Sequence, residues 1–148
     1  MTEGTATPIK PRDNTAQIVN ELLSERQQVW SLYCSVAGME PFTPNKSIEQ
    51  LVQEFCQVLV DYISLGHFGI YQRILDGGER RKQILEAAEK YYPGIAAATE
   101  AVLAFNDKYQ KITPSLILNG LSDDLSEVGE KLATRIELED HLISRIQS

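Results

Sequence analysis

The stretch LSDDLSEVGEKLATRIELEDHLISRI, residues 121–146, carries the clearest structural pattern in the chain. Apolar residues recur in it at gaps of four and three residues: Leu121, Leu125, Val128, Leu132, Leu142 and Ile146. This spacing gathers them on one side of an α-helix, which must pack against other helices to bury them. Positions 135 and 139 belong to the same side, yet they hold Arg135 and Glu139. The stretch therefore predicts a packed helix with charges on its inner face.

The other long segments also have helical patterns, and none shows the alternation of a strand. Residues 1–12, with Thr, Gly and two prolines, predict a disordered tail ahead of a single helical-bundle domain, residues 13–148. A first helix is expected from Asp13 or Asn14, either of which can cap it, to about Ala37.

Two further segments complete the predicted bundle. A capping box beginning at Ser47 starts a second helix, which continues or bends through Gly66. A third segment, about 79–112, is expected to be broken at Pro93 and Gly94, because proline removes a backbone donor and clashes with the preceding turn. The predicted fold class is all-α: an antiparallel bundle of four long helical segments, one of them broken.

Composition narrows the function. A net charge of −7 and a pI near 4.8 argue against direct nucleic-acid binding, which needs a basic face. They fit a basic protein partner, although acidity can also serve solubility alone. Because no apolar run reaches about 18 residues and no signal peptide is evident, we expect a soluble, cytoplasmic protein away from membranes. Cys34 and Cys56 lie in apolar helical stretches, which favours reduced core residues.

The second helix has an unusual outer side. Residues at helical spacing on that side are Gln50, Glu54, Gln57, Asp61, Ser64, Phe68 and Tyr71. An exposed acid followed by exposed aromatic rings is more typical of a partner-docking surface than of a catalytic site. The alternative is that Phe68 and Tyr71 turn inward after a bend at Gly66. The candidate partner-binding residues are Asp61, Ser64, His67, Phe68 and Tyr71.

A second set of candidates lies on the inner faces. Arg26 interrupts the apolar stripe of the first helix, as Arg135 and Glu139 interrupt that of the last. Because an unpaired buried charge costs several kcal/mol, we expect these three and Asp140 to form one internal polar network. The network could fix the packing of the helices, or it could form a polar pocket that takes part in binding.

The chain lacks the residue patterns that several kinds of chemistry require. A carboxylate di-iron bundle needs Glu-x-x-His motifs, but neither His67 nor His141 has a glutamate three residues before it. No glycine-rich phosphate loop, Cys-x-x-Cys pair or nucleophile elbow is present. We therefore expect no metal, no cofactor and no catalytic residues. The alternative function is a phosphotransfer or metal-binding helical bundle that uses His67 or His141.

Two blocks resemble a known family. FCQVLVDYISLGHFGIYQRI, Phe55–Ile74, and LSEVGEKLATRIELEDHLI, Leu125–Ile143, are similar to the Rsd/AlgQ family of bacterial regulators, which bind the primary sigma factor of RNA polymerase. A weaker similarity covers Arg26 and the aromatic-rich VWSLYCSVAG that follows it.

The resemblance implies a function without turnover. It implies an anti-sigma regulator that binds region 4 of the primary sigma factor and occludes the contacts of region 4 with promoter DNA and core polymerase. Asp61 would pair with an arginine of the partner, while Phe68 and Tyr71 would be buried as anchors.

Overall fold

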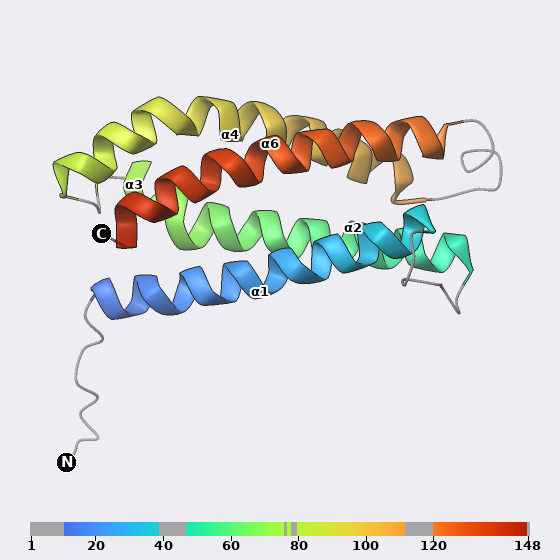
Figure 1. The fold of residues 1–148 in the computed structure, drawn as a ribbon, viewed down its shortest axis with the longest axis horizontal. Helices are drawn as coiled ribbons and strands as arrows, with labels where there is room; N and C mark the ends of the chain where they lie inside the picture. Colours follow the sequence, from blue (N-terminus) through green and yellow to red (C-terminus); the bar gives the residue numbers. More distant parts are fainter. Residues whose placement is uncertain (1–10, 39–46, 76, 78–79, 112–119, 148) are drawn as a thin grey trace, which may run out of the picture.

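The computed structural model describes residues 11–38, 47–75, 77, 80–111 and 120–147. Within them four long helices run along one axis (Figure 1), and no strand is present. The long helices are α1 (Pro11–Ala37), α2 (Ile48–Gly66), α4 (Lys82–Tyr109) and α6 (Leu121–Gln147). A π-helical turn, η1 (His67–Tyr71), extends α2 into the short helix α3 (Gln72–Leu75). The predicted all-α antiparallel bundle is confirmed.

The bundle is built from two helical pairs. α1 packs mainly on α2, and α4 packs mainly on α6, so that the two pairs form opposite halves of the view in Figure 1. Buried apolar side chains from all four long helices join in one core, which includes Leu22, Phe55, Ile95 and Leu132. Burial of these stripes drives the association of the helices. No helix in the described residues is long and apolar enough to cross a membrane.

The helix ends follow local sequence signals. The Ser47 side chain caps α2 by accepting a hydrogen bond from the Gln50 amide at 3.2 Å, as its capping motif predicted. Gly38 follows α1 with a φ of 70°, a conformation that favours glycine. α1 begins at Pro11, so Pro11 and Arg12, which the sequence predicts to lie in the tail, are helical. Residues 1–10, the rest of the predicted tail, lie outside the described residues.

The predicted break in the third segment is wrong. α4 continues through Pro93 as one bowed helix (Figure 1). The proline is exposed, so the helix can bend around its ring, and buried residues on both sides hold α4 against the core. Gly94 permits close packing there, because a Cβ atom at this position would lie 2.6 Å from Cδ1 of Leu138 on α6. Tertiary packing therefore overrides the local cost of the proline.

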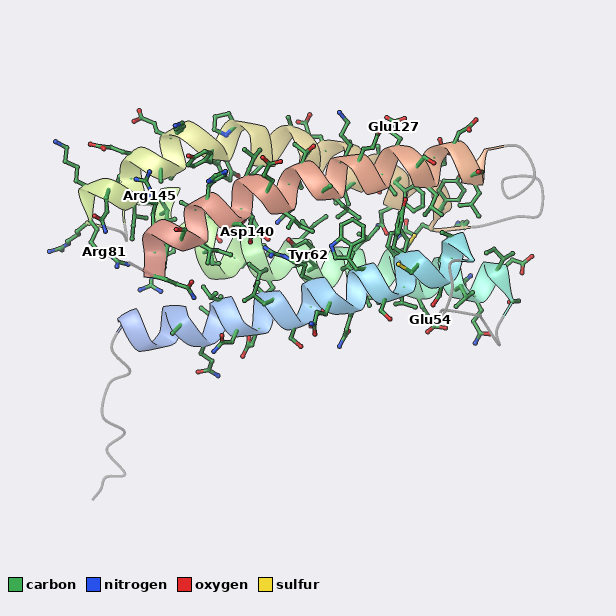
Figure 2. The ribbon with its side chains drawn as sticks, viewed as in Figure 1. Glu54, Tyr62, Arg81, Glu127, Asp140 and Arg145 are labelled. Carbon is green, nitrogen blue, oxygen red and sulfur yellow. The ribbon has the colours of Figure 1, made fainter. Side chains whose placement is uncertain are left out.

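The side chains between the pairs include polar ones. Figure 2 labels Tyr62 and Asp140 near the middle of the bundle, and Arg81 and Arg145 at one end of it. At that end, Nη1 of Arg81 donates a hydrogen bond to the carbonyl of Ile146 at 3.3 Å. The central polar residues form the more extensive arrangement.

Candidate functional site

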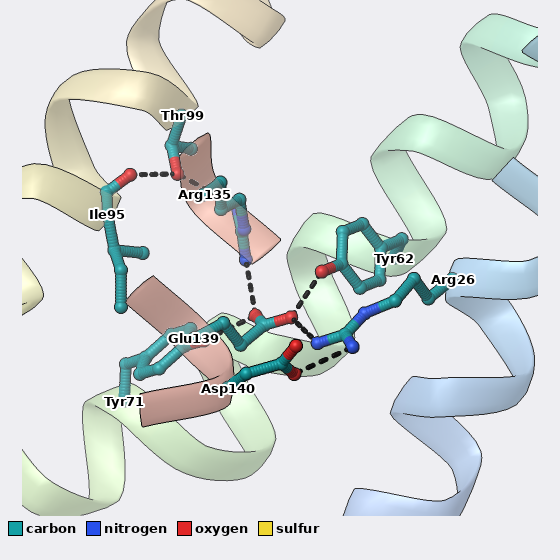
Figure 3. Close-up of polar contacts among 8 residues, drawn as sticks. All are labelled: Arg26, Tyr62, Tyr71, Ile95, Thr99, Arg135, Glu139 and Asp140. Carbon is teal, nitrogen blue, oxygen red and sulfur yellow. Dashed lines mark hydrogen bonds and ion pairs between the residues drawn. The ribbon is translucent and has the colours of Figure 1, made fainter. Parts of the chain in front are cut away.

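A buried carboxylate, Glu139, is the centre of the internal polar network (Figure 3). Nη2 of Arg26, from α1, donates to Oε1 of Glu139 at 2.8 Å. The hydroxyl of Tyr62, from α2, donates to the same oxygen, and the hydroxyl of Tyr71, from η1, donates to Oε2. Three segments of the α1–α2 half are thereby tied to one residue of α6. Such a complete set of donors offsets the cost of burying the charge.

Arg135 lies one turn before Glu139 and is 1% exposed. Its Nη1 donates to Oγ1 of Thr99, on α4, at 2.7 Å, while its Nη2 stands 3.6 Å from Oε2 of Glu139. The guanidinium also lies over two aromatic rings, 5.2 Å from the centre of Tyr62 and 5.9 Å from that of Tyr71. Cation–π contacts of this kind are strengthened by exclusion of water. Arg135 thus links α4 to the Glu139 network.

The fourth predicted member of the network, Asp140, lies at its rim. Its Oδ1 accepts a hydrogen bond from Nη1 of Arg26 at 2.7 Å, but its side chain is 55% exposed. The structure therefore brings all four predicted residues together, with the correction that Asp140 does not point inward. Burial lowers the pKa of Arg26, but its bonds to Glu139 and Asp140 outweigh that effect and raise the pKa overall. Arg26 stays charged at every ordinary pH.

The two tyrosines predict a loss of stability in alkali. Burial, together with the charge of Glu139, raises the pKa of Tyr62 and Tyr71 above the ordinary tyrosine value of 10.0. Above that pH the unfolded chain loses tyrosine protons that the folded chain keeps. The contribution of the two tyrosines to the stability of the fold should be complete below about pH 10 and should decrease as the pH rises further. Melting temperatures followed by circular dichroism from about pH 8 to about pH 11 would measure this decrease.

A variant serves as the control for this prediction. Tyr62→Phe removes one of the two groups, so its melting temperature should fall less steeply with pH than that of the parent. Parallel pH profiles for the parent and Tyr62→Phe would contradict the prediction.

The outer strip of α2 and η1 carries most of the candidate partner-binding residues. Asp61 is exposed and accepts a hydrogen bond from Nε2 of Gln57 at 3.0 Å. Ser64 and His67 are partly exposed, and the Phe68 side chain is 66% exposed. The His67 ring stands edge-on to the Phe68 ring, with centres 4.8 Å apart. We call Asp61, Ser64, His67 and Phe68 the docking strip.

Tyr71 does not belong to this strip. It is 2% exposed and bonded to Glu139, so the prediction that it faces outward is wrong, whereas the same prediction for Phe68 is confirmed. The reason is the π-helical turn, which has more residues per turn than an α-helix. Each residue of the turn is therefore rotated less about the helix axis than in an α-helix. Tyr71 consequently faces the core and not the outer side that α-helical spacing predicts for it.

Two surface hollows flank the docking strip. On the α1 side, a hollow of about 520 Å³ is lined by three carboxylates, Glu21, Glu25 and Asp61. On the α4 side, a hollow of about 430 Å³ has mainly apolar walls that include Phe68 and Leu103. Ser64 lines both hollows. The strip thus separates an acidic surface from an apolar one, a combination that suits a partner with basic and apolar side chains.

Sequence reasoning missed the residues that α1 and α4 contribute to these hollows. Glu21 and Glu25 are four residues apart, so a shared face of α1 was detectable. Nothing in the sequence says that this face adjoins Asp61, because the packing of α1 against α2 decides it. Leu103, 40% exposed on α4, was likewise indistinguishable from an isolated surface leucine.

The two histidines occupy different surroundings. His67 belongs to the docking strip, whereas His141 is exposed on α6 and stacks on Tyr91, with ring centres 5.0 Å apart and planes 9° apart. Across the part of the chain that the structure describes, no three His, Cys, Asp or Glu side chains group in a way that could hold a metal ion.

Fold and site together define the class of this protein: an all-α bundle with an ion-paired interior and an exposed aromatic residue between two surface hollows. The sequence pattern of the family described as "Regulator of RNA polymerase sigma(70) subunit, Rsd/AlgQ" matches residues 3–147. The chain belongs to the Rsd/AlgQ family, which associates it with regulation of transcription through a sigma factor.

Individual relatives agree with this assignment. The chain is 34% identical over 142 residues to a protein of Yersinia enterocolitica named Regulator of sigma D, a match that covers 86% of this chain and 78% of that protein. A protein of the same name from Enterobacter sp. strain 638 is 34% identical over 138 residues, covering 86% of this chain and 79% of the relative. No solved structure shows a significant match.

Proposed function

We propose that this protein is an anti-sigma regulator that binds region 4 of the primary sigma factor through the docking strip. The observation that carries the proposal is the exposed Phe68, 66% accessible, between a carboxylate-lined hollow and an apolar one. A large aromatic side chain exposed in this way gains much by burial against a partner. Membership of the Rsd/AlgQ family supports a sigma factor as that partner.

The charges support the same partner. Region 4 is a small basic domain that uses a helix-turn-helix to contact DNA phosphates and bases. The carboxylates of Glu21, Glu25 and Asp61 would meet its basic side chains, and the net charge of −7 would speed their encounter. Phe68 and the apolar hollow would supply most of the affinity.

The proposed mechanism is occlusion. A region 4 domain held on the docking strip would present its basic surface to this protein instead of to promoter DNA and core polymerase. The mechanism involves no chemical step, no cofactor and no direct contact between this protein and nucleic acid. A sigma factor as the partner supports the proposal that the protein acts in the cytoplasm.

Removal of the exposed ring tests the proposal. Phe68→Ala should weaken binding to region 4 by about 2 kcal/mol or more, as expected for a central aromatic anchor. Because Phe68 is largely exposed, its melting temperature should stay close to that of the parent. Isothermal titration calorimetry with purified region 4 would measure the difference.

Leu85 provides a matched control, since it is an exposed apolar residue of α4 outside both hollows. Leu85→Ala should leave the affinity for region 4 unchanged. Equal affinities of Phe68→Ala and Leu85→Ala would exclude the docking strip as the binding surface. If the parent also failed to bind region 4, the choice of partner would be wrong.

A further inference from the structure

The π-helical turn η1 presents two aromatic rings to opposite environments. Phe68 is 66% exposed, whereas Tyr71, three residues later, is 2% exposed and bonded to Glu139. A π-helical turn has poorer hydrogen-bond geometry than an α-helix and occurs mostly as a single turn, often at functional sites. Its persistence in the middle of a helix therefore requires contacts that favour it over regular α-helix.

Tyr71 makes these contacts. Its hydroxyl donates to Oε2 of Glu139, and its ring lies beneath the guanidinium of Arg135 and 5.7 Å from the ring of Tyr92. Gly66, at the start of the turn, leaves the space that the side chains of Tyr71 and Arg135 need. A Cβ atom there would lie 3.0 Å from Nη2 of Arg135 and 3.1 Å from Cε2 of Tyr71. The inner side of η1 is thus fixed from α2, α4 and α6.

Tyr71 and Arg135 also border the surface beside the docking strip. Tyr71 and Arg135 line the apolar hollow of about 430 Å³, as do His67 and Phe68 of the docking strip. The inner and outer sides of the turn are therefore parts of one structure. A change in the register of η1 would rotate Phe68 around the helix and reshape the hollow beside it.

We infer that Tyr71 and Glu139 are positioning residues for partner binding, which hold η1 in the register that presents Phe68. The inference rests on the proposed function and extends it to two buried residues that lie outside the docking strip. The hydrogen bond from Tyr71 to Glu139 keeps the turn π-helical. Without this bond η1 samples other registers, and the partner must select the competent one at a cost in affinity.

Tyr62 supplies a matched comparison. Its hydroxyl bonds to the other oxygen of the same carboxylate, but Tyr62 lies in α2, ahead of the turn. Tyr71→Phe and Tyr62→Phe each remove one buried hydroxyl from Glu139 and should destabilise the fold similarly. Affinity for region 4 should fall about five- to tenfold in Tyr71→Phe and less than about twofold in Tyr62→Phe, a difference within the range of coupling between contacting residues.

A double-mutant cycle distinguishes positioning from a general loss of stability. If Tyr71 acts through Phe68, adding Tyr71→Phe to Phe68→Ala should cause little further loss of affinity. Adding Tyr62→Phe to Phe68→Ala should have the same small effect as Tyr62→Phe alone. Equal losses of affinity in the two tyrosine variants, or additivity of Tyr71→Phe with Phe68→Ala, would overturn the inference. The proposed function would survive that result as long as Phe68→Ala alone weakens binding.

Gly66→Ala tests the inference independently, in case Tyr71→Phe does not fold. It retains both hydroxyls and favours regular helix, but its methyl group presses on Tyr71 and Arg135. We expect this variant to bind region 4 several-fold more weakly than the parent. Parent-like affinity in a folded Gly66→Ala protein would contradict a positioning role for the turn.

Discussion

A variant carrying Asp61→Arg should fold like the parent while its affinity for region 4 falls by about 2–5 kcal/mol, as expected when an interfacial charge pair is replaced by like charges. Asp61 is exposed on α2 and its one described hydrogen-bond partner is Gln57, one turn earlier on the same helix. Its replacement therefore breaks no hydrogen bond or ion pair to another helix within the described residues. An arginine there would also face the carboxylates of Glu21 and Glu25 and neutralise part of the acidic hollow.

The experiment needs a control for net charge. Glu127→Arg changes the net charge by the same amount, and Glu127 is exposed on α6, in the half of the bundle away from α1 (Figure 2). Calorimetry with purified region 4 should show a large loss for Asp61→Arg and a small one for Glu127→Arg. Partial recovery of binding when a region 4 arginine is changed to aspartate would identify the paired residue. Parent-like binding by folded Asp61→Arg would leave the internal polar network as the next candidate.

Glu139→Ala should cause the largest loss of stability of any change considered. It removes a carboxylate that is 0% exposed and leaves the guanidinium of Arg135, 1% exposed, without its anion. The hydroxyls of Tyr62 and Tyr71 lose their acceptors at the same time. Breaking a buried ion pair from one side costs about 3–5 kcal/mol, so the free energy of unfolding should fall by that amount.

Urea denaturation followed by circular dichroism would measure this loss. Asp140→Ala is the matched comparison, because Asp140 pairs with Arg26 in the same network but its side chain is 55% exposed. A pair so exposed contributes about 0–1 kcal/mol, so Asp140→Ala should be close to the parent. Equal midpoints for Glu139→Ala and the parent would mean that the network does not stabilise the fold.

The two variants separate two roles of the polar residues. Asp61→Arg should change binding without changing stability, whereas Glu139→Ala should change stability first. Binding by Glu139→Ala is informative only where the variant is folded, for example at low temperature. Comparison of Tyr71→Phe with Tyr62→Phe tests whether the buried network also determines the geometry of the docking strip.

Periodicity alone identified much of the interior. The spacing of apolar residues in α6 placed Arg135 and Glu139 on the buried side, and the cost of an unpaired charge placed Arg26 beside them. Periodicity could not reveal that the partners of Arg135 and Glu139 include Tyr62, Tyr71 and Thr99. Hydroxyl groups at apolar positions do not stand out in a sequence, since tyrosine and threonine are common in cores and on surfaces alike.

The sequence by itself determined the all-α class, the inner faces of the helices and the exposure of Asp61, because each follows from spacing along one helix. Only the tertiary structure decided that α4 continues through Pro93, and that Phe68 faces outward while Tyr71 faces inward. In both cases, contacts with another helix outweigh the preference of the local sequence. Those contacts join residues far apart in the chain, and their free energy appears only when the helices pack together.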